Sequence, residues 1–168
     1  MSRIIEQLLT TNLYLSPKNI NHDIDNIIKH EMKKKYEGLC FEHGYIIPDT
    51  IDIIHKSVGK LKTENNKSKI IYNIKYKVKT IFPTEGDELD VYINNKNKLG
   101  IISYIKLGIQ EKETFEESPL IIIIPNEYII QSSLNIDDIF IGQKIKVYIL
   151  GCRIKYNSDK IQVIAKPI

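Results

Sequence analysis

Apolar and polar residues alternate along several stretches of this chain, which is the pattern of strands with one buried face. The longest such stretch covers residues 70–82, where Ile74, Tyr76 and Val78 alternate with lysines. After residue 86 the pattern becomes purely β. Five shorter strands are predicted there, around residues 89–93, 101–107, 120–124, 145–149 and 161–165.

A strand followed by a helix is predicted near the N-terminus. The strand ends with Leu13 and Leu15, and Ser16 and Pro17 are typical of a helix start, with Ser as the N-cap and Pro in the first turn. Gly38 suits the C-terminal end of the helix. One face of the predicted helix is an apolar stripe formed by Ile20, Ile24, Ile27, Ile28 and Met32.

The turn from Pro83 to Gly86 is the predicted boundary between two domains. Residues 1–82 are expected to form an α+β domain. Residues 83–168 are expected to form a five-stranded barrel with a helical insert between the third and fourth strands, which is the order of an OB-fold. The predicted fold class is therefore α+β, with the barrel as the C-terminal half.

Composition adds little to this picture. The chain has 35 Ile and 22 Lys against 2 Arg, an excess typical of AT-rich coding in a large DNA virus or certain protists. A net charge of +3 is too small to indicate a nucleic-acid-binding protein by itself. The lysines in residues 70–82 have two interpretations: a solvated strand face, or a basic strip that faces nucleic acid.

No catalytic motif occurs in the sequence. The four histidines do not form H-E-x-x-H, and the glycines do not form a phosphate-binding loop. Cys40 and His43 have metal-ligand spacing but lack a second ligand pair, so no metal is expected. Cys40 and Cys152 are expected to be reduced thiols. We therefore expect a soluble intracellular protein that is not an enzyme, has no cofactor and does not contact a membrane.

Several short motifs occur in an order and spacing that resemble one protein family. They are Leu13-Tyr14-Leu15 before Pro17, Glu37-Gly38-Leu39-Cys40 followed by Gly44-Tyr45-Ile46, Gly59-Lys60-Leu61, Ile74-Lys75-Tyr76-Lys77-Val78, Phe82-Pro83 followed by Gly86-Asp87, Leu99-Gly100-Ile101, and Gly142-Gln143-Lys144-Ile145-Lys146-Val147. This series resembles the stalk subunit of multi-subunit RNA polymerases, meaning subunit seven of RNA polymerase II and its archaeal counterpart.

The resemblance implies a truncated ribonucleoprotein-like domain over residues 1–82 and an RNA-binding OB barrel near the RNA exit path. It implies docking on the polymerase core subunits through a tip segment, and pairing with a small helical stalk partner subunit. The expected core-contact residues are Gly38, Leu39, Phe41, Gly44 and Tyr45.

Weak binding of nascent single-stranded RNA is expected on the barrel, because OB barrels combine basic grooves with aromatic platforms. An acidic loop over residues 111–117 is expected to border the site and to restrain affinity. The candidate RNA-binding residues are Tyr92, Lys96, Lys98, Tyr104 and Lys106.

The alternative hypothesis is a free-standing OB-fold RNA-binding protein or a translation-factor mimic. A free-standing barrel would not need the first 82 residues. Their presence therefore favours the polymerase-subunit hypothesis over this alternative. The departures of this sequence from the cellular members of that family, together with its AT-rich composition, suggest a large DNA virus as the source. If the source is viral, we expect the protein in the virion and the host cytoplasm, and otherwise in the nucleus.

Overall fold

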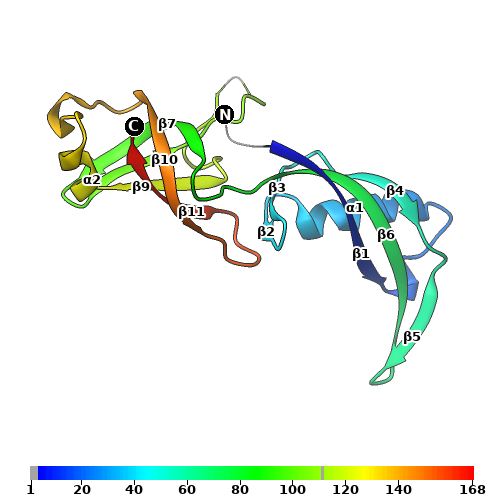
Figure 1. The fold of residues 1–168 in the computed structure, drawn as a ribbon. Helices are drawn as coiled ribbons and strands as arrows, with labels where there is room; N and C mark the ends of the chain where they lie inside the picture. The colour runs from blue at the N-terminus through cyan, green and yellow to red at the C-terminus, as the bar shows by residue number, and fades with distance from the viewer. Residues whose placement is uncertain (1–3, 111) are drawn as a thin grey trace. The chain divides into compact units, whose positions relative to one another are not determined.

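The computed structural model describes residues 4–110 and 112–168, and these residues are mainly β (Figure 1). They divide into two compact units. Residues 5–38 and 46–80 form the first, called the N-terminal unit below. The second consists mainly of residues 39–45 and 81–168 and is called the barrel unit.

One long strand organises the N-terminal unit. In β6, Tyr72, Ile74, Tyr76 and Val78 are buried, while the residues between them are exposed. α1 covers the buried side, where the rings of Tyr36 and Tyr76 lie 6.1 Å apart. β6 pairs with β1, β3, β4 and β5. The elements of this unit are β1 (Ile4–Leu15), α1 (Ile24–Tyr36), β4 (Asp52–Lys56), β5 (Lys60–Glu64) and β6 (Lys67–Ile81), whereas most of β3 (Gly44–Ile46) is counted with the barrel unit.

The helix begins later than the sequence predicts. Pro17–Asn19 forms only a 3-10 turn, and α1 starts at Ile24 with Asp23 as its N-cap. The Ser16 side chain makes no capping hydrogen bond. The Asn21 side chain instead accepts the backbone N–H of Asp23 at 2.8 Å, which favours a local turn over helix.

A short hairpin of β2 (Cys40–Phe41) and β3 belongs mostly to the barrel unit. The backbone N–H of Cys40 donates to the carbonyl of Ser158 at 2.7 Å, and that of Asn157 donates to the carbonyl of Cys40 at 2.9 Å. Burial, with a smaller effect of Asp159, raises the pKa of the Cys40 thiol to about 11. This segment is therefore held in place by residues more than a hundred positions later in the chain.

The barrel unit contains a closed five-stranded barrel with strand order β10-β11-β9-β8-β7. β9 and β11 are parallel, and the other neighbouring strands are antiparallel. The helix α2 (Asn126–Gln131) and a 3-10 turn (Ile136–Asp138) lie between β9 and β10. The barrel strands are β7 (Glu88–Asn97), β8 (Gly100–Tyr104), β9 (Leu120–Pro125), β10 (Lys144–Arg153) and β11 (Ile161–Pro167).

The predicted five-stranded barrel with its helical insert is confirmed, and it is compatible with an OB-fold. The division into domains 1–82 and 83–168 stays a prediction. Within residues 4–110 and 112–168, no helix is long and apolar enough to cross a membrane. The same residues contain no group of three or more His, Cys, Asp or Glu that could hold a metal ion.

Gly100 provides a test of the barrel geometry. Its φ is +146°, and a Cβ there would lie 2.1 Å from the carbonyl oxygen of Ile124 on β9. Gly142 also has a positive φ, +87°, but a Cβ there would meet nothing within 4 Å. We expect Gly100→Ala to lower the free energy of unfolding by about 3–5 kcal/mol and Gly142→Ala by only about 1–2 kcal/mol. Chemical denaturation of both variants measures the difference, and equal losses would contradict the described β8–β9 contact.

Candidate nucleic-acid interface on the barrel

Two tyrosines lie side by side on the outer face of the barrel. Tyr92 on β7 is paired directly with Tyr104 on β8, so both side chains leave the sheet on the same face. Their ring centroids are 5.9 Å apart and both rings are partly exposed. Because exposed aromatic rings can stack with nucleic-acid bases, this pair is suited to base binding.

Lysines surround the tyrosine pair. The Lys106 Nζ lies 4.3 Å from the centroid of the Tyr92 ring. Lys144 of β10 is paired with Tyr92 and forms a 3.0 Å ion pair with Asp90. Their hydrogen bond lowers the pKa of Asp90 and raises the pKa of Lys144, so both groups remain charged at neutral pH.

The outer face extends across β10 to β11. Lys146 is paired with Asp90, and Tyr148 is paired with Lys166 of β11. The Lys166 Nζ lies 5.2 Å from the centroid of the Tyr148 ring. We call this surface the barrel face, and its residues are Tyr92, Tyr104, Lys106, Lys144, Lys146, Tyr148 and Lys166, with the acidic Glu88 and Asp90 at paired positions on the same face.

The loop between β8 and β9 adds an aromatic residue that the sequence pattern does not predict. Phe115 packs edge-on against Tyr104 at 6.1 Å. Lys160 holds this part of the loop, because its Nζ donates to the backbone carbonyls of Phe115, Glu116 and Ser118. No local sequence signal identifies Phe115, because its position depends on that long-range anchor.

The same loop uses its acids to order its own backbone. The Glu113 carboxylate accepts the backbone N–H groups of Leu107, Ile109 and Gln110. The Glu117 carboxylate accepts the backbone N–H of Thr114 at 3.2 Å. Glu111 lies outside the described residues. The predicted effect of the loop on RNA affinity therefore stays a prediction, but two of its acids already have partners within the loop.

The five predicted RNA-binding residues form two groups. Tyr92, Tyr104 and Lys106 lie together. The Lys96 Nζ instead donates to the backbone carbonyls of Ile136 and Ile139, at 3.0 and 2.8 Å. Lys98 is exposed at the far end of the β7–β8 hairpin.

The predicted core-contact residues are less exposed than the sequence suggests. Gly44 and Tyr45 are buried, whereas Gly38, Leu39 and Phe41 are half-buried. The Phe41 ring packs edge-on against Tyr156 at 5.1 Å. Docking through this segment stays a prediction, and Tyr45 is better explained as part of the core.

Comparisons with known proteins give sequence relatives but no family model. No protein-family model matches the chain. The chain is 26% identical over 97 residues to DNA-directed RNA polymerase II subunit rpb7 of Dictyostelium discoideum. The match covers 56% of this chain and 54% of that protein, so it spans about half the length of both.

The position of Lys96 generates a testable prediction. We expect Lys96→Met to lower the free energy of unfolding by about 1 kcal/mol, because two carbonyls after α2 lose a charged donor. Lys98→Met should leave stability unchanged within about 0.5 kcal/mol, as expected for an exposed surface position. Urea denaturation measures the stability of both variants. A destabilised Lys98→Met with an unchanged Lys96→Met would contradict the structural role given to Lys96.

Proposed function

We propose that this chain is a non-catalytic stalk subunit of a multi-subunit DNA-dependent RNA polymerase. The observation that carries this proposal is the similarity to the rpb7 subunit of RNA polymerase II over 97 residues. The closed five-stranded barrel is compatible with this function. In the proposal, the N-terminal unit is a truncated ribonucleoprotein-like domain that docks on the core and the barrel is an OB-fold that contacts RNA.

The barrel face is the proposed site for nascent single-stranded RNA. Tyr92 and Tyr104 provide adjacent stacking surfaces, and Lys106, Lys144 and Lys146 provide positive charge next to them. Stacking is tolerant of sequence because every base has an aromatic face. We therefore propose weak, salt-sensitive binding without strong sequence preference.

Two surfaces are candidates for docking on the polymerase core. The first is the β2–β3 hairpin, where Leu39 and Phe41 retain some exposure. The second surface, in the N-terminal unit, comprises Val58 in the connection from β4 to β5 and Leu61 of β5, which are 85% and 69% exposed. Because Val58 and Leu61 are two large apolar residues exposed within four positions of each other, the second surface is the better candidate for an interface.

Other parts of the proposal concern context. We propose a small helical partner subunit in the stalk, and a large DNA virus as the source, with the protein in virions and the host cytoplasm. A nuclear location follows if the source is cellular. The alternative function, a free-standing OB-fold RNA-binding protein or translation-factor mimic, predicts RNA binding without polymerase association.

We expect Tyr104→Ala to weaken binding of a labelled single-stranded RNA by about 5- to 100-fold, because one stacked base contributes about 1–3 kcal/mol. Lys106→Gln should lower the slope of log affinity against log salt by about 0.7, because one phosphate contact is lost. Fluorescence anisotropy with the full chain measures both. Lys155→Gln, at an exposed position between β10 and β11 outside the predicted RNA-binding residues, is the matched control and should change neither value. Unchanged binding in Tyr104→Ala would remove the barrel face as the RNA site.

A second prediction separates the two docking surfaces. Val58→Ser with Leu61→Ser should reduce co-purification of the polymerase core with the tagged chain about tenfold or more, because apolar anchors dominate interface energy. Phe41→Ala should reduce it less. Thermal unfolding of each variant controls for folding. The opposite order of losses would assign docking to the β2–β3 hairpin, and no loss in either would exclude both surfaces.

A further inference from the structure

The exposed face of the sheet in the N-terminal unit concentrates positive charge. Alternation along β6 places five lysines on the side opposite α1, and cross-strand pairing adds two from β5. Against these seven lysines the face has three carboxylates, Glu6, Asp52 and Glu64, so its net charge is +4. The whole chain has 24 basic and 21 acidic residues. The remaining 17 basic and 18 acidic residues nearly cancel, so this face accounts for the basic character of the protein. The seven lysines of this sheet face are Lys60, Lys62, Lys67, Lys69, Lys75, Lys77 and Lys79.

Pairing across the strands keeps like charges together. Lys62 of β5 lies directly opposite Lys69 of β6, and like charges at opposed positions destabilise a sheet. Two of the carboxylates offset only part of this charge: Glu64 pairs with Lys62 at 2.8 Å, and Glu6 pairs with Lys77 at 3.2 Å. An anionic ligand explains a sheet face with this repulsion between lysines more simply than solvation alone does.

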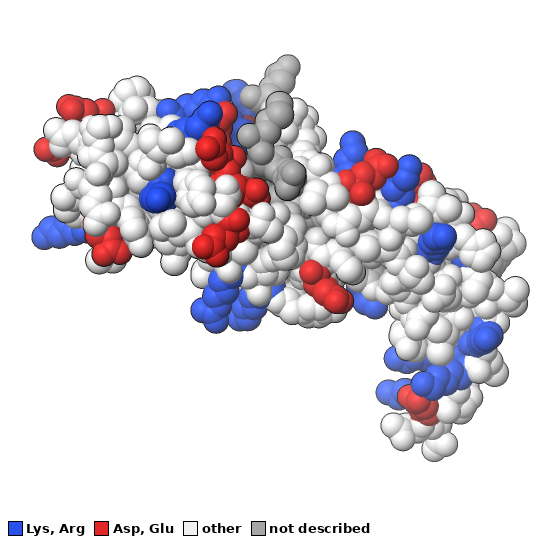
Figure 2. All heavy atoms as spheres, in the orientation of Figure 1, with Lys and Arg blue, Asp and Glu red and all other residues white. Residues whose placement is uncertain are grey.

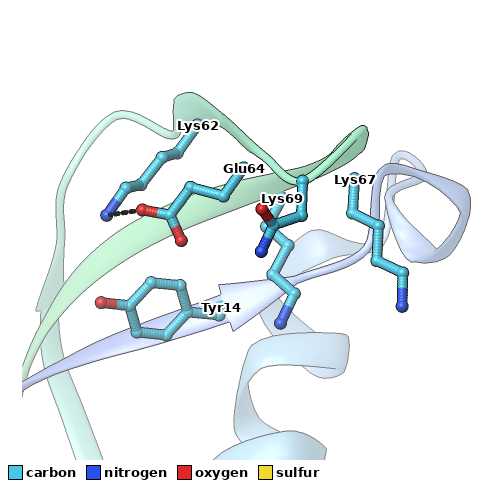
Figure 3. Close-up of a pocket in the computed structure, with 6 residues that line it drawn as sticks. Tyr14, Lys62, Glu64, Lys67 and Lys69 are labelled. Atoms are coloured by element: carbon cyan, nitrogen blue, oxygen red, sulfur yellow. Dashed lines mark ion pairs between the residues drawn. The ribbon is translucent and has the colours of Figure 1, made fainter.

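An aromatic ring borders the densest part of this charge. Tyr14 at the end of β1 lines a hollow of about 270 Å³ together with Lys62, Glu64, Lys67 and Lys69 (Figure 3). The Tyr14 side chain is about half exposed. Figure 2 shows lysines gathered around the end of the β5–β6 hairpin. A base could stack on the Tyr14 ring while the neighbouring ammonium groups contact phosphates.

The linear arrangement suits an extended ligand. Alternate side chains of β6 point to this face with a repeat of about 6.6 Å, and Ile71 and Asn73 separate the lysines at 67 and 69 from those at 75, 77 and 79. Successive phosphates of an extended nucleic-acid strand have a comparable spacing. Leu61, proposed above for docking, lies between Lys60 and Lys62 and therefore points to the opposite face of β5.

We propose that this sheet face is a second binding site for single-stranded nucleic acid, separate from the barrel face. The Tyr14 ring stacks with a base, and the two groups of lysines along β6 contact phosphates on either side of a gap at Ile71 and Asn73. The site does not depend on the polymerase assignment, because it follows from the charge and geometry of the N-terminal unit.

The test uses the full chain with the barrel face disabled by Tyr104→Ala and Lys106→Gln in every protein. Binding of labelled oligouridine and oligothymidine of equal length is measured by fluorescence anisotropy over a series of salt concentrations. Lys67→Gln, Lys69→Gln and Lys75→Gln together should weaken binding about tenfold or more at low salt, and should lower the salt slope by about 2, at about 0.7 per phosphate contact. The matched control removes three lysines from elsewhere in the same unit, with Lys18→Gln, Lys29→Gln and Lys33→Gln, and should leave affinity within about twofold.

Tyr14 supplies a second readout. Tyr14→Ala should weaken binding by about 5- to 100-fold, while Tyr14→Phe should keep the affinity because the ring is retained. Equal losses in the two lysine triples would overturn the proposal, because binding would then follow total charge. Absence of binding to both oligonucleotides at low salt would also overturn the proposal. An acidic protein surface would then be the better candidate ligand for this face. A difference between the two oligonucleotides would support the site and identify RNA or DNA as its ligand.

Discussion

Strict alternation of side chains along β6 is the constraint on which the N-terminal unit depends. Ile74, Tyr76 and Val78 are buried beneath α1, and each contributes roughly 1.5–3 kcal/mol by leaving water. The same period of two places lysines on the other face, so the burial that forms the core also builds the basic surface. A shift of one residue in strand register would exchange the two faces, which makes the register strongly determined.

The barrel applies the same rule in a closed sheet. Val91, Val147 and Val163 point into a fully buried interior, and the residues between them form the outer face. Closure through the β7–β10 pairing brings Lys144 next to Tyr92, although they are far apart in the sequence. The candidate RNA surface is thus a consequence of strand order, and the chemistry at its centre is a tyrosine pair surrounded by ammonium groups.

Local patterns predict much of this molecule, and long-range contacts account for what they miss. The apolar pattern identifies the five barrel strands and places Tyr92 and Tyr104 at outward or rim positions, whereas their direct pairing is seen only in the structure. The same pattern does not show that Lys96 bonds to carbonyls after α2, or that Phe115 is positioned by Lys160. The hairpin at Cys40 looks like an exposed tip in sequence because its partners lie near residue 157. The predicted helix start is wrong because a side-chain turn at Asn21 competes with the helix. The helix-start preference of Ser16 and Pro17 does not reveal this competition.

The central claim is that the chain is a polymerase stalk subunit, and the most direct measurement is the composition of its native complex. The wild-type chain, tagged and purified from its native source, would be analysed by quantitative mass spectrometry. A polymerase stalk subunit should be recovered with the two largest subunits of a DNA-dependent RNA polymerase, each in a one-to-one ratio with the chain. Recovery of the chain alone, or with ribosomes in place of polymerase subunits, would contradict it.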